Sequence, residues 1–340
     1  MASRSRVTIR DVAERVGVHP STVSRVLNPA TRGRITSEIV EKVTDAAAEL
    51  GYRPNQTARG LRTNRTRTIG VLIPDITNPL FPPIIRGIED GLGADGYTAI
   101  LGNTDNIASR ESEAVSTLRA RQIDGLILAT ARRDDPIVAE CIADGLPLVL
   151  VNRTADADGV SSIVNDDALG IALAVRHLKE RGHTRIAHIA GPRSLSTGEA
   201  RRQSFIAAMK AEGLEAEPAL IAETTAFSKD EGLRAAAQLI SGEAKFTAIV
   251  AANDLIALGA YEALGDAGLR CPDEISVTGF NDMPFVDRLS PPLTTVRIPH
   301  YELGREAGRR LVELIENPDS PARATTLRPE LIVRGSTAKV

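Results

Sequence analysis

The sequence predicts an α/β protein in which an N-terminal helical domain precedes a two-lobed core of parallel sheets. Three observations lead to this fold class. The first 67 residues show helical periodicity alone, the rest alternate short apolar runs with amphipathic stretches, and this alternation occurs in two successive series. A chain of 340 residues is also long enough for two or three domains with a sizeable core.

Charge is divided unevenly along the chain. The formal net charge is −3, but residues 1–67 contain 13 Lys and Arg against 6 Asp and Glu, a net of +7, which leaves −10 for residues 68–340. A short basic block beside a longer acidic one predicts that the first part binds a polyanion such as nucleic acid. Ordinary surface bias is the alternative until motifs are considered.

Several features predict a cytoplasmic protein. The longest apolar runs are far shorter than a membrane span, and Arg4 and Arg6 stand where a signal peptide would have its apolar stretch. Cys141 and Cys271 lie 130 positions apart without a CxxC or CxxH neighbour. This spacing excludes a disulfide framework or a thiolate zinc site and fits a reducing compartment.

A helix-turn-helix motif is predicted at the N-terminus. Thr8 with Asp11 three residues later is typical of a capped helix start, Gly17 ends that helix, and Pro20 stands where a second helix begins. Such a second helix can lie in the DNA major groove. Its outward residues are Ser21, Thr22, Ser24 and Arg25. Hydroxyl and guanidinium groups reach base edges and phosphates there.

A third amphipathic helix is predicted over residues 37–50, ending at Gly51, and it closes a small three-helix core. Asn55 is a candidate N-cap for the following segment, residues 56–62, which is too short to hold a helix alone. A generic helical hairpin with a linker remains the alternative for this part of the chain.

Residues 68–340 contain the continuous apolar runs expected of buried parallel strands. The first series comprises residues 69–73, 98–101, 125–128 and 148–151, and the second comprises 185–189, 248–251 and 275–278. Helical stretches such as residues 84–92 and 111–118 separate them. Two doubly wound sheets in tandem are predicted, and a ligand would bind in a shared cleft beyond the carboxyl ends of the strands.

Polar residues follow several of these strands: Asp75, Asn78, Asn103, Asp105, Asn253, Asp254, Asn281 and Asp282. Amides and carboxylates that line a cleft suit a ligand rich in hydroxyl groups, because buried polar groups need partners. Each residue alone is as readily explained as a helix N-cap. Their repetition at one edge of the sheets favours a cleft.

The N-terminal motifs resemble the headpiece and hinge of the lactose-repressor (LacI) family. The resemblance is carried by Thr8-Ile9-Arg10-Asp11-Val12-Ala13, Val18, Thr22-Val23-Ser24-Arg25-Val26-Leu27-Asn28, Gly51-Tyr52-Arg53-Pro54-Asn55, Ala58 and Leu61. It implies DNA contacts from Thr8, Pro20, Ser21, Thr22, Ser24, Arg25, Asn28, Asn55, Ala58 and Leu61. It further implies a hinge that folds as a helix on DNA, pairs with its twin and inserts Leu61 into the minor groove. His19 and Pro20 depart from the family pattern, so the operator sequence is left open.

The core is similar to the periplasmic-binding-protein-like core of the same family. The matching motifs are Gly182-His183-Thr184-Arg185-Ile186-Ala187, Gly191-Pro192, Ala252-Asn253-Asp254, Gly259-Ala260, Gly279-Phe280-Asn281-Asp282 and Pro291-Pro292-Leu293-Thr294-Thr295-Val296. The resemblance implies an effector site formed by Leu80, Phe81, Asp166, Thr197, Arg201, Phe227, Asn253 and Asn281. Asn281 replaces the aspartate common at its position, so hydrogen bonding to the ligand can differ there.

The resemblance implies a headpiece at residues 1–54, a hinge helix and linker at 55–67, and a core at 68–340. The N-lobe is expected to comprise about 68–166 and 299–326, and the C-lobe about 167–298 and 327–340. The expected protein is a homodimeric transcriptional regulator, with repression as the expected mode, on pseudo-palindromic double-stranded operator DNA at the bacterial nucleoid. A sugar or sugar derivative is the expected effector. Residues 334–340 show no heptads, so a tetramerising coiled coil is not expected.

A sugar-binding receptor and a sugar-modifying enzyme, both without a DNA role, are the alternatives. Residues 91–96 match G-x-G-x-x-G, but a helix precedes them and a strand follows, so they indicate helix termination rather than a dinucleotide site. His177, His183 and His188 lack acidic partners at metal spacing. The sequence contains no G-x-S-x-G, P-loop or His-Glu-x-x-His motif. We therefore expect no enzymatic activity, cofactor or metal.

Overall fold

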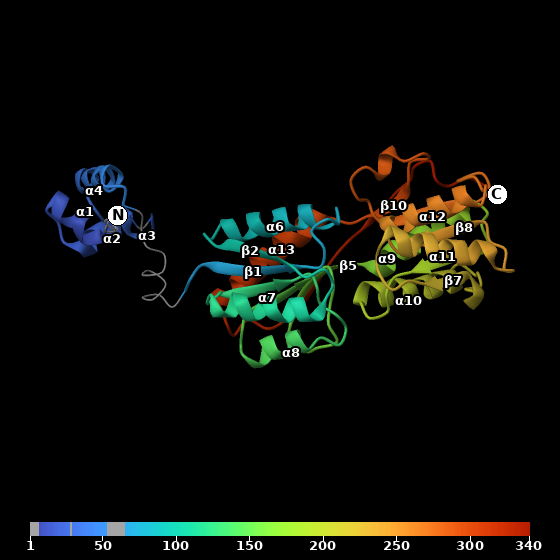
Figure 1. Cartoon of the computed structure of the whole chain (residues 1–340), viewed down its shortest axis with the longest axis horizontal. Helices are drawn as coiled ribbons and strands as arrows, with labels where there is room; N and C mark the ends of the chain where they lie inside the picture. Colours follow the sequence, from blue (N-terminus) through green and yellow to red (C-terminus); the bar gives the residue numbers. More distant parts are fainter. Residues whose placement is uncertain (1–6, 28, 53–64) are drawn as a thin grey trace, which may run out of the picture. The chain divides into compact units, whose positions relative to one another are not determined.

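The computed structural model describes residues 7–27, 29–52 and 65–340. The chain divides into two compact units, Met1–Thr66 and Arg67–Val340, each described by itself (Figure 1). The predictions for Asn28, Asn55, Ala58 and Leu61 lie outside the described residues. Among the helices that the structure describes, none is long and apolar enough to cross a membrane.

The first unit contains α1 (Ile9–Val16), α2 (Pro20–Val26), α3 (Pro29–Arg32) and α4 (Ser37–Glu49). The Asp11 carboxylate accepts hydrogen bonds from the backbone N–H of Thr8 at 2.7 Å and from its hydroxyl at 2.9 Å, which fixes the start of α1. Gly17 ends the helix at φ +73°, a conformation that favours glycine. The valines at 12, 23 and 43 are fully buried and join α1, α2 and α4 in one core.

The N-lobe of the second unit is built on a parallel sheet in the order β11-β5-β4-β3-β1-β2. Its strands are β1 (Thr68–Ile73), β2 (Thr98–Asn103), β3 (Gly125–Leu128), β4 (Leu148–Val151), β5 (Ser161–Asn165) and β11 (Ala324–Leu327). Its helices are α6 (Phe81–Gly93), α7 (Ala108–Ala120), α8 (Pro136–Ala143) and α13 (His300–Glu316).

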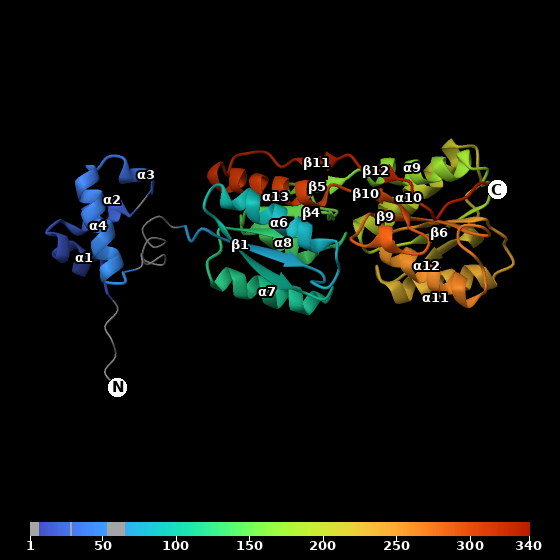
Figure 2. The same cartoon turned by 90° about the horizontal axis from the view of Figure 1, so that it is seen from above.

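The helices cover both faces of this sheet. Ile69 and Val71 of β1 belong to the core shared with α6 and α13, whereas Leu72 points to the opposite face, where α7 and α8 pack. Figure 2 shows α13 and α6 apart from α7 in the same way. Burial on both faces explains why these strands are continuous apolar runs.

The C-lobe is built on a second sheet in the order β12-β10-β9-β8-β6-β7. Its strands are β6 (Ile186–Ala190), β7 (Ile221–Glu223), β8 (Ala248–Ala251), β9 (Ser276–Asn281), β10 (Thr294–Arg297) and β12 (Glu330–Ile332). Its helices are α9 (Asp167–Glu180), α10 (Ser196–Ala211), α11 (Lys229–Ser241), α12 (Asp254–Asp266) and the short 3-10 turns η1 (Pro218–Leu220) and η2 (Val286–Arg288).

Two local expectations need correction. The edge strand β12 pairs antiparallel with β10, so the second sheet is not wholly parallel. The helix predicted over residues 84–92 begins earlier, at Phe81, because Pro82 and Pro83 fall in its first turn, where a missing N–H is tolerated. The G-x-G-x-x-G stretch does lie at the end of α6 and before β2, as expected of a helix end.

The chain crosses between the lobes after β5, after β10 and after β11, as far as the described residues extend. These crossings place the carboxyl ends of strands from both sheets around a single region of the second unit. Helices α6 and α13 lie side by side in the N-lobe in both views (Figures 1 and 2).

Glycines allow α6 and α13 to approach closely. A Cβ atom on Gly87 would lie 2.0 Å from the carbonyl oxygen of Tyr301, and one on Gly304 would lie 1.9 Å from that of Ile84. Backbone atoms cannot yield as side-chain ends can, so any side chain at these positions must push the two helices apart.

We expect Gly87→Ala to lower the free energy of unfolding of the protein by about 2 kcal/mol or more through overpacking. Gly93→Ala is the matched control, because it lies on the same helix and a Cβ atom there would meet no other described part of the chain within 4 Å. Alanine there should be neutral or stabilising by up to about 1 kcal/mol. Urea unfolding of both variants is the measurement, and equal stability of the two would contradict the close approach.

Candidate functional site

A pocket of about 320 Å³, partly open to solvent, lies between the lobes. It is lined by Asn78, Leu80, Phe81, Asn152, Arg153, Thr197, Arg201, Phe227, Asn253 and Asn281. The two lobes both contribute, with the loops after β1 and β4 on one side and α10 with the ends of β7, β8 and β9 on the other. This is the position where ligands bind in open parallel sheets.

Most of the residues expected to contact an effector come together here. The structure places Leu80, Phe81, Thr197, Arg201, Phe227, Asn253 and Asn281 in the lining. Asp166 is not among the lining residues; its carboxylate accepts a hydrogen bond from the backbone N–H of Leu169 at 2.9 Å and caps α9.

Three lining residues were absent from the expected effector contacts. Asn78 had been singled out only as a polar residue after the first strand. Asn152 and Arg153 directly follow the apolar run of β4, so the rule that identified Asn253 and Asn281 would have found them too.

Arg201 is held rigidly within the pocket wall. Its Nε donates to Asp167 Oδ1 at 2.9 Å, its Nη1 donates to the carbonyl oxygen of Ala252 at 2.8 Å, and its guanidinium lies 3.8 Å from the ring centre of Phe280. The side chain is 3% exposed. Burial raises the pKa of Asp167, while the Arg201 charge opposes that shift. A guanidinium fixed in this way can donate to a ligand with little loss of entropy.

Asparagine amides provide the other polar groups. Asn253 Oδ1 accepts from the N–H of Ile256 at 2.9 Å and caps α12, which leaves the amide nitrogen to donate. The Oδ1 atoms of Asn152 and Asn281 are buried, and neither has a hydrogen-bond partner within the described part of the chain. Both residues have positive φ, +65° and +113°. Ligand hydroxyl groups would satisfy these acceptors.

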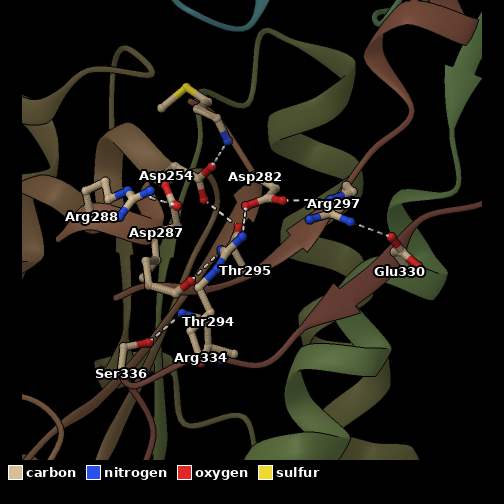
Figure 3. A network of polar contacts seen from close by, with 12 residues as sticks. Asp254, Asp282, Asp287, Arg288, Thr294, Thr295, Arg297, Glu330, Arg334 and Ser336 are labelled. Atoms are coloured by element: carbon tan, nitrogen blue, oxygen red, sulfur yellow. Dashed lines mark hydrogen bonds and ion pairs between the residues drawn. The ribbon is translucent and has the colours of Figure 1, made fainter. Parts of the chain in front are cut away.

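A buried polar network holds the backbone at Asn281 (Figure 3). Asp254 is fully buried and accepts from the N–H of Met283 at 2.8 Å and from the hydroxyl of Thr295 at 2.5 Å. Asp282 forms ion pairs of 2.7 Å with both Arg297 and Arg334. The strand that crosses back to the N-lobe is thereby tied to the pocket wall.

The predicted DNA-contacting residues that the structure describes lie on the first unit. Ser21 and Arg25 of α2 are exposed, and Thr22 and Ser24 are half-buried. His19 Nδ1 accepts from the N–H of Ser21 at 3.2 Å and lies 2.8 Å from its hydroxyl oxygen, so His19 and Ser21 form one unit at the start of α2. Pro20 occupies the first turn of this helix, and Thr8 caps α1.

The histidines have structural surroundings. His188 is fully buried, lies 2.7 Å from the carbonyl oxygen of Val250 through Nδ1, and stacks on Phe205. Burial lowers its pKa to about 4, so it is neutral at physiological pH. Within the described ranges, no cluster of three or more His, Cys, Asp or Glu residues could hold a metal ion.

Comparison with known proteins identifies the family. Residues 8–55 match the model of bacterial regulatory proteins of the lacI family, and residues 175–337 match a periplasmic binding protein-like domain. The ribose operon repressor of Escherichia coli (strain K12) is 37% identical over 333 residues, which covers 97% of this chain and 99% of that protein. The chain belongs to the LacI family.

Other relatives agree with this assignment. The HTH-type transcriptional repressor CytR of Escherichia coli (strain K12) is 34% identical over 97% of this chain and 96% of its own length. A structure of the lac repressor dimer bound to operator and the anti-inducer ONPF has a TM-score of 0.86 at 29% identity, over 98% of this chain and 100% of that one. A LacI family regulator from Enterococcus faecium with bound ribose has a TM-score of 0.70 at 32% identity, over 80% and 99%.

This LacI-family chain is therefore a DNA-binding transcriptional regulator that responds to a small polar effector, and it is not an enzyme. The predicted family, fold class and regulatory function are confirmed, and the receptor and enzyme alternatives fall.

The pKa of Asp254 generates a test of the network at the pocket wall. Burial raises this pKa from 3.8 to about 7, so the folded protein favours the protonated acid. The stabilisation is fully present below about pH 4 and is lost as the pH rises through about 7. We expect the melting temperature to fall between pH 6 and pH 8, and Asp254→Asn to flatten that fall.

Asp287→Asn is the control, because Asp287 lies nearby but is half exposed and pairs with Arg288. Its melting temperature should follow that of the unmodified protein across the pH range. Parallel curves for Asp254→Asn and the unmodified protein would rule out titration of Asp254 in this window.

Proposed function

We propose that this LacI-family regulator is a homodimeric repressor whose affinity for operator DNA is set by a sugar or sugar derivative bound between the lobes. The observation that carries the proposal is the pocket in which four asparagine amides and two arginines face three apolar side chains, Leu80, Phe81 and Phe227. Amides and guanidinium groups pair with hydroxyls, and aromatic faces cover the C–H face of a sugar ring.

The size of the pocket and the relatives narrow the effector class. About 320 Å³ lies at the lower end of ligand pockets, which suits a monosaccharide-sized molecule. The ribose operon repressor and the ribose-bound regulator are the relatives whose names indicate a sugar. We therefore propose a pentose or a pentose derivative.

The DNA contacts are assigned to the headpiece and hinge. We propose that α2 lies in the major groove, with Ser21, Thr22, Ser24 and Arg25 toward bases and phosphates, Pro20 at its start, and Thr8 and Asn28 on the backbone. Asn55, Ala58 and Leu61 form the hinge contact, in which Leu61 inserts into the minor groove. Two such units on a homodimer read a pseudo-palindromic operator, which places the protein at the nucleoid in the cytoplasm.

The lobes form the switch. A ligand that binds the closed pocket more tightly than the open one shifts the protein toward closure, by no more than its difference in affinity for the two states. The crossings between the lobes carry this change toward the N-terminal side of the core, where the hinge joins at Arg67.

A screen of sugars, sugar phosphates and nucleosides by thermal shift, followed by operator binding with each hit, tests the proposed effector class. We expect Phe227→Ala to weaken binding of the best hit by about tenfold, since an aromatic face over a ring contributes roughly 0.5–1.5 kcal/mol beyond its buried area. Phe246→Ala is the matched control. It is also half-buried and packs on the same C-lobe core, but it does not line the pocket.

The control variant should keep the affinity of the unmodified protein. A screen in which no compound alters operator binding would overturn the proposed control by a sugar, and equal losses in both variants would remove Phe227 from the ligand contacts.

The hinge contact has its own test. We expect Leu61→Ala to weaken operator binding by tenfold or more, because the bent and widened groove is lost, while binding to non-specific DNA changes by less than twofold. Ile107→Ala, which removes an exposed apolar side chain from the core, is the control and should change neither affinity. Fluorescence anisotropy with operator and scrambled duplexes measures both. Equal loss on the two duplexes would sink the wedge role of Leu61.

A further inference from the structure

The pocket carries more positive charge than a neutral sugar requires. Its lining contains Arg153 and Arg201 and no carboxylate. Arg201 is balanced by Asp167 at 2.9 Å. Arg153 lies within 4 Å of no carboxylate oxygen in the part of the chain that the structure describes. One of the two pocket cations is therefore unpaired.

Arg153 is also poorly satisfied by neutral groups. The residue is 6% exposed, and its Nη1 has two long contacts, 3.4 Å to Asn106 Oδ1 and 3.3 Å to the carbonyl oxygen of Thr130. Its Nε is buried without an acceptor among the described residues. A buried guanidinium with unused donors is costly unless something else pairs with it.

The charged groups around Arg153 do not supply that partner. Glu111 faces it, but this carboxyl group is itself buried, accepts a hydrogen bond from Thr130, and has its pKa raised by burial. Arg132 and Arg201 also act on Arg153 and repel its charge. Burial lowers the pKa of Arg153 to about 10, so it stays charged at physiological pH.

A second set of donors lies on the opposite wall. Helix α10 begins at Ser196 with Leu195 at its N-cap, so no side chain caps it, and Thr197 in its first turn lines the pocket. The Ser196 hydroxyl accepts from the N–H of Thr154, which links this helix start to the residue after Arg153.

The other two helices that start at the pocket differ in this respect. Asn253 caps α12, and α6 has Pro82 and Pro83 in its first turn, which lack N–H groups. The first turn of α10 is thus the helix start at the pocket with free backbone donors, next to an unpaired arginine. This pairing of helix N–H groups with a guanidinium is the chemistry that binds phosphates and carboxylates.

We propose that the effector is an anionic sugar derivative, a phosphate ester or a sugar acid, whose anionic group is bound by Arg153 and the first turn of α10. This inference rests on the proposed function and narrows its effector class. The asparagines at 152 and 281 add no negative charge that would repel such a group.

The test compares D-ribose with D-ribose 5-phosphate and D-ribonate by calorimetry on the full chain, at one pH and ionic strength. We expect at least one of the two anions to bind tenfold or more tightly than ribose. Arg153→Gln should weaken binding of that anion at least tenfold and binding of ribose less than threefold. Arg133→Gln is the control, because Arg133 pairs with Asp156 outside the pocket, and it should change neither affinity.

The two anions distinguish a phosphate site from a carboxylate site. The proposal is overturned if ribose binds as tightly as both anions, or if Arg153→Gln weakens ribose and the anion by the same factor. If none of the three binds, replacing chloride by inorganic phosphate at constant ionic strength must still raise the melting temperature of the unmodified protein more than that of Arg153→Gln; an equal rise overturns the proposal. A neutral sugar that alters operator binding would refute the anionic site and leave the proposed function standing.

Discussion

The pocket depends on one constraint, the parallel direction of the strands that lead into it. Because strands from both sheets end toward the same region, residues as distant in sequence as Asn78 and Asn281 line a single cavity. The close packing of α6 on α13 keeps the first strands in place on the N-lobe side. On the C-lobe side, the Asp254 and Asp282 network ties the end of β9 to β10.

Much of the fold could be predicted from the sequence because buried parallel strands leave a strong apolar signal. The runs at residues 125–128, 148–151 and 248–251 coincide with β3, β4 and β8. The strands without such a prediction, such as β5 and β11, are short and rich in Ser and Thr, and they form only by pairing with neighbours already in place. Local composition cannot show such tertiary pairing.

The site was predictable where a side chain follows a recognisable strand, and less so where its role depends on what surrounds it. Asp166 has the right position after β5, but its carboxylate is used to cap α9. The converse holds for Arg153, whose importance comes from lacking a carboxylate neighbour, a property of packing in three dimensions. Burial and pairing decide which of several polar residues at a strand end remains available to a ligand.

The same local device occurs in both lobes and connects stability to regulation. Asn152 and Asn281 each follow a buried strand, adopt a positive φ and hold a buried amide oxygen without a partner among the described residues. Backbone strain of this kind costs about 1–3 kcal/mol per residue and persists only when the surroundings enforce it. A ligand that donates to both oxygens recovers part of this cost, but only when the lobes are close enough for one molecule to reach both. The unsatisfied groups therefore give the closed state a larger gain on binding than the open state, and this difference is what can move the protein between DNA-binding states.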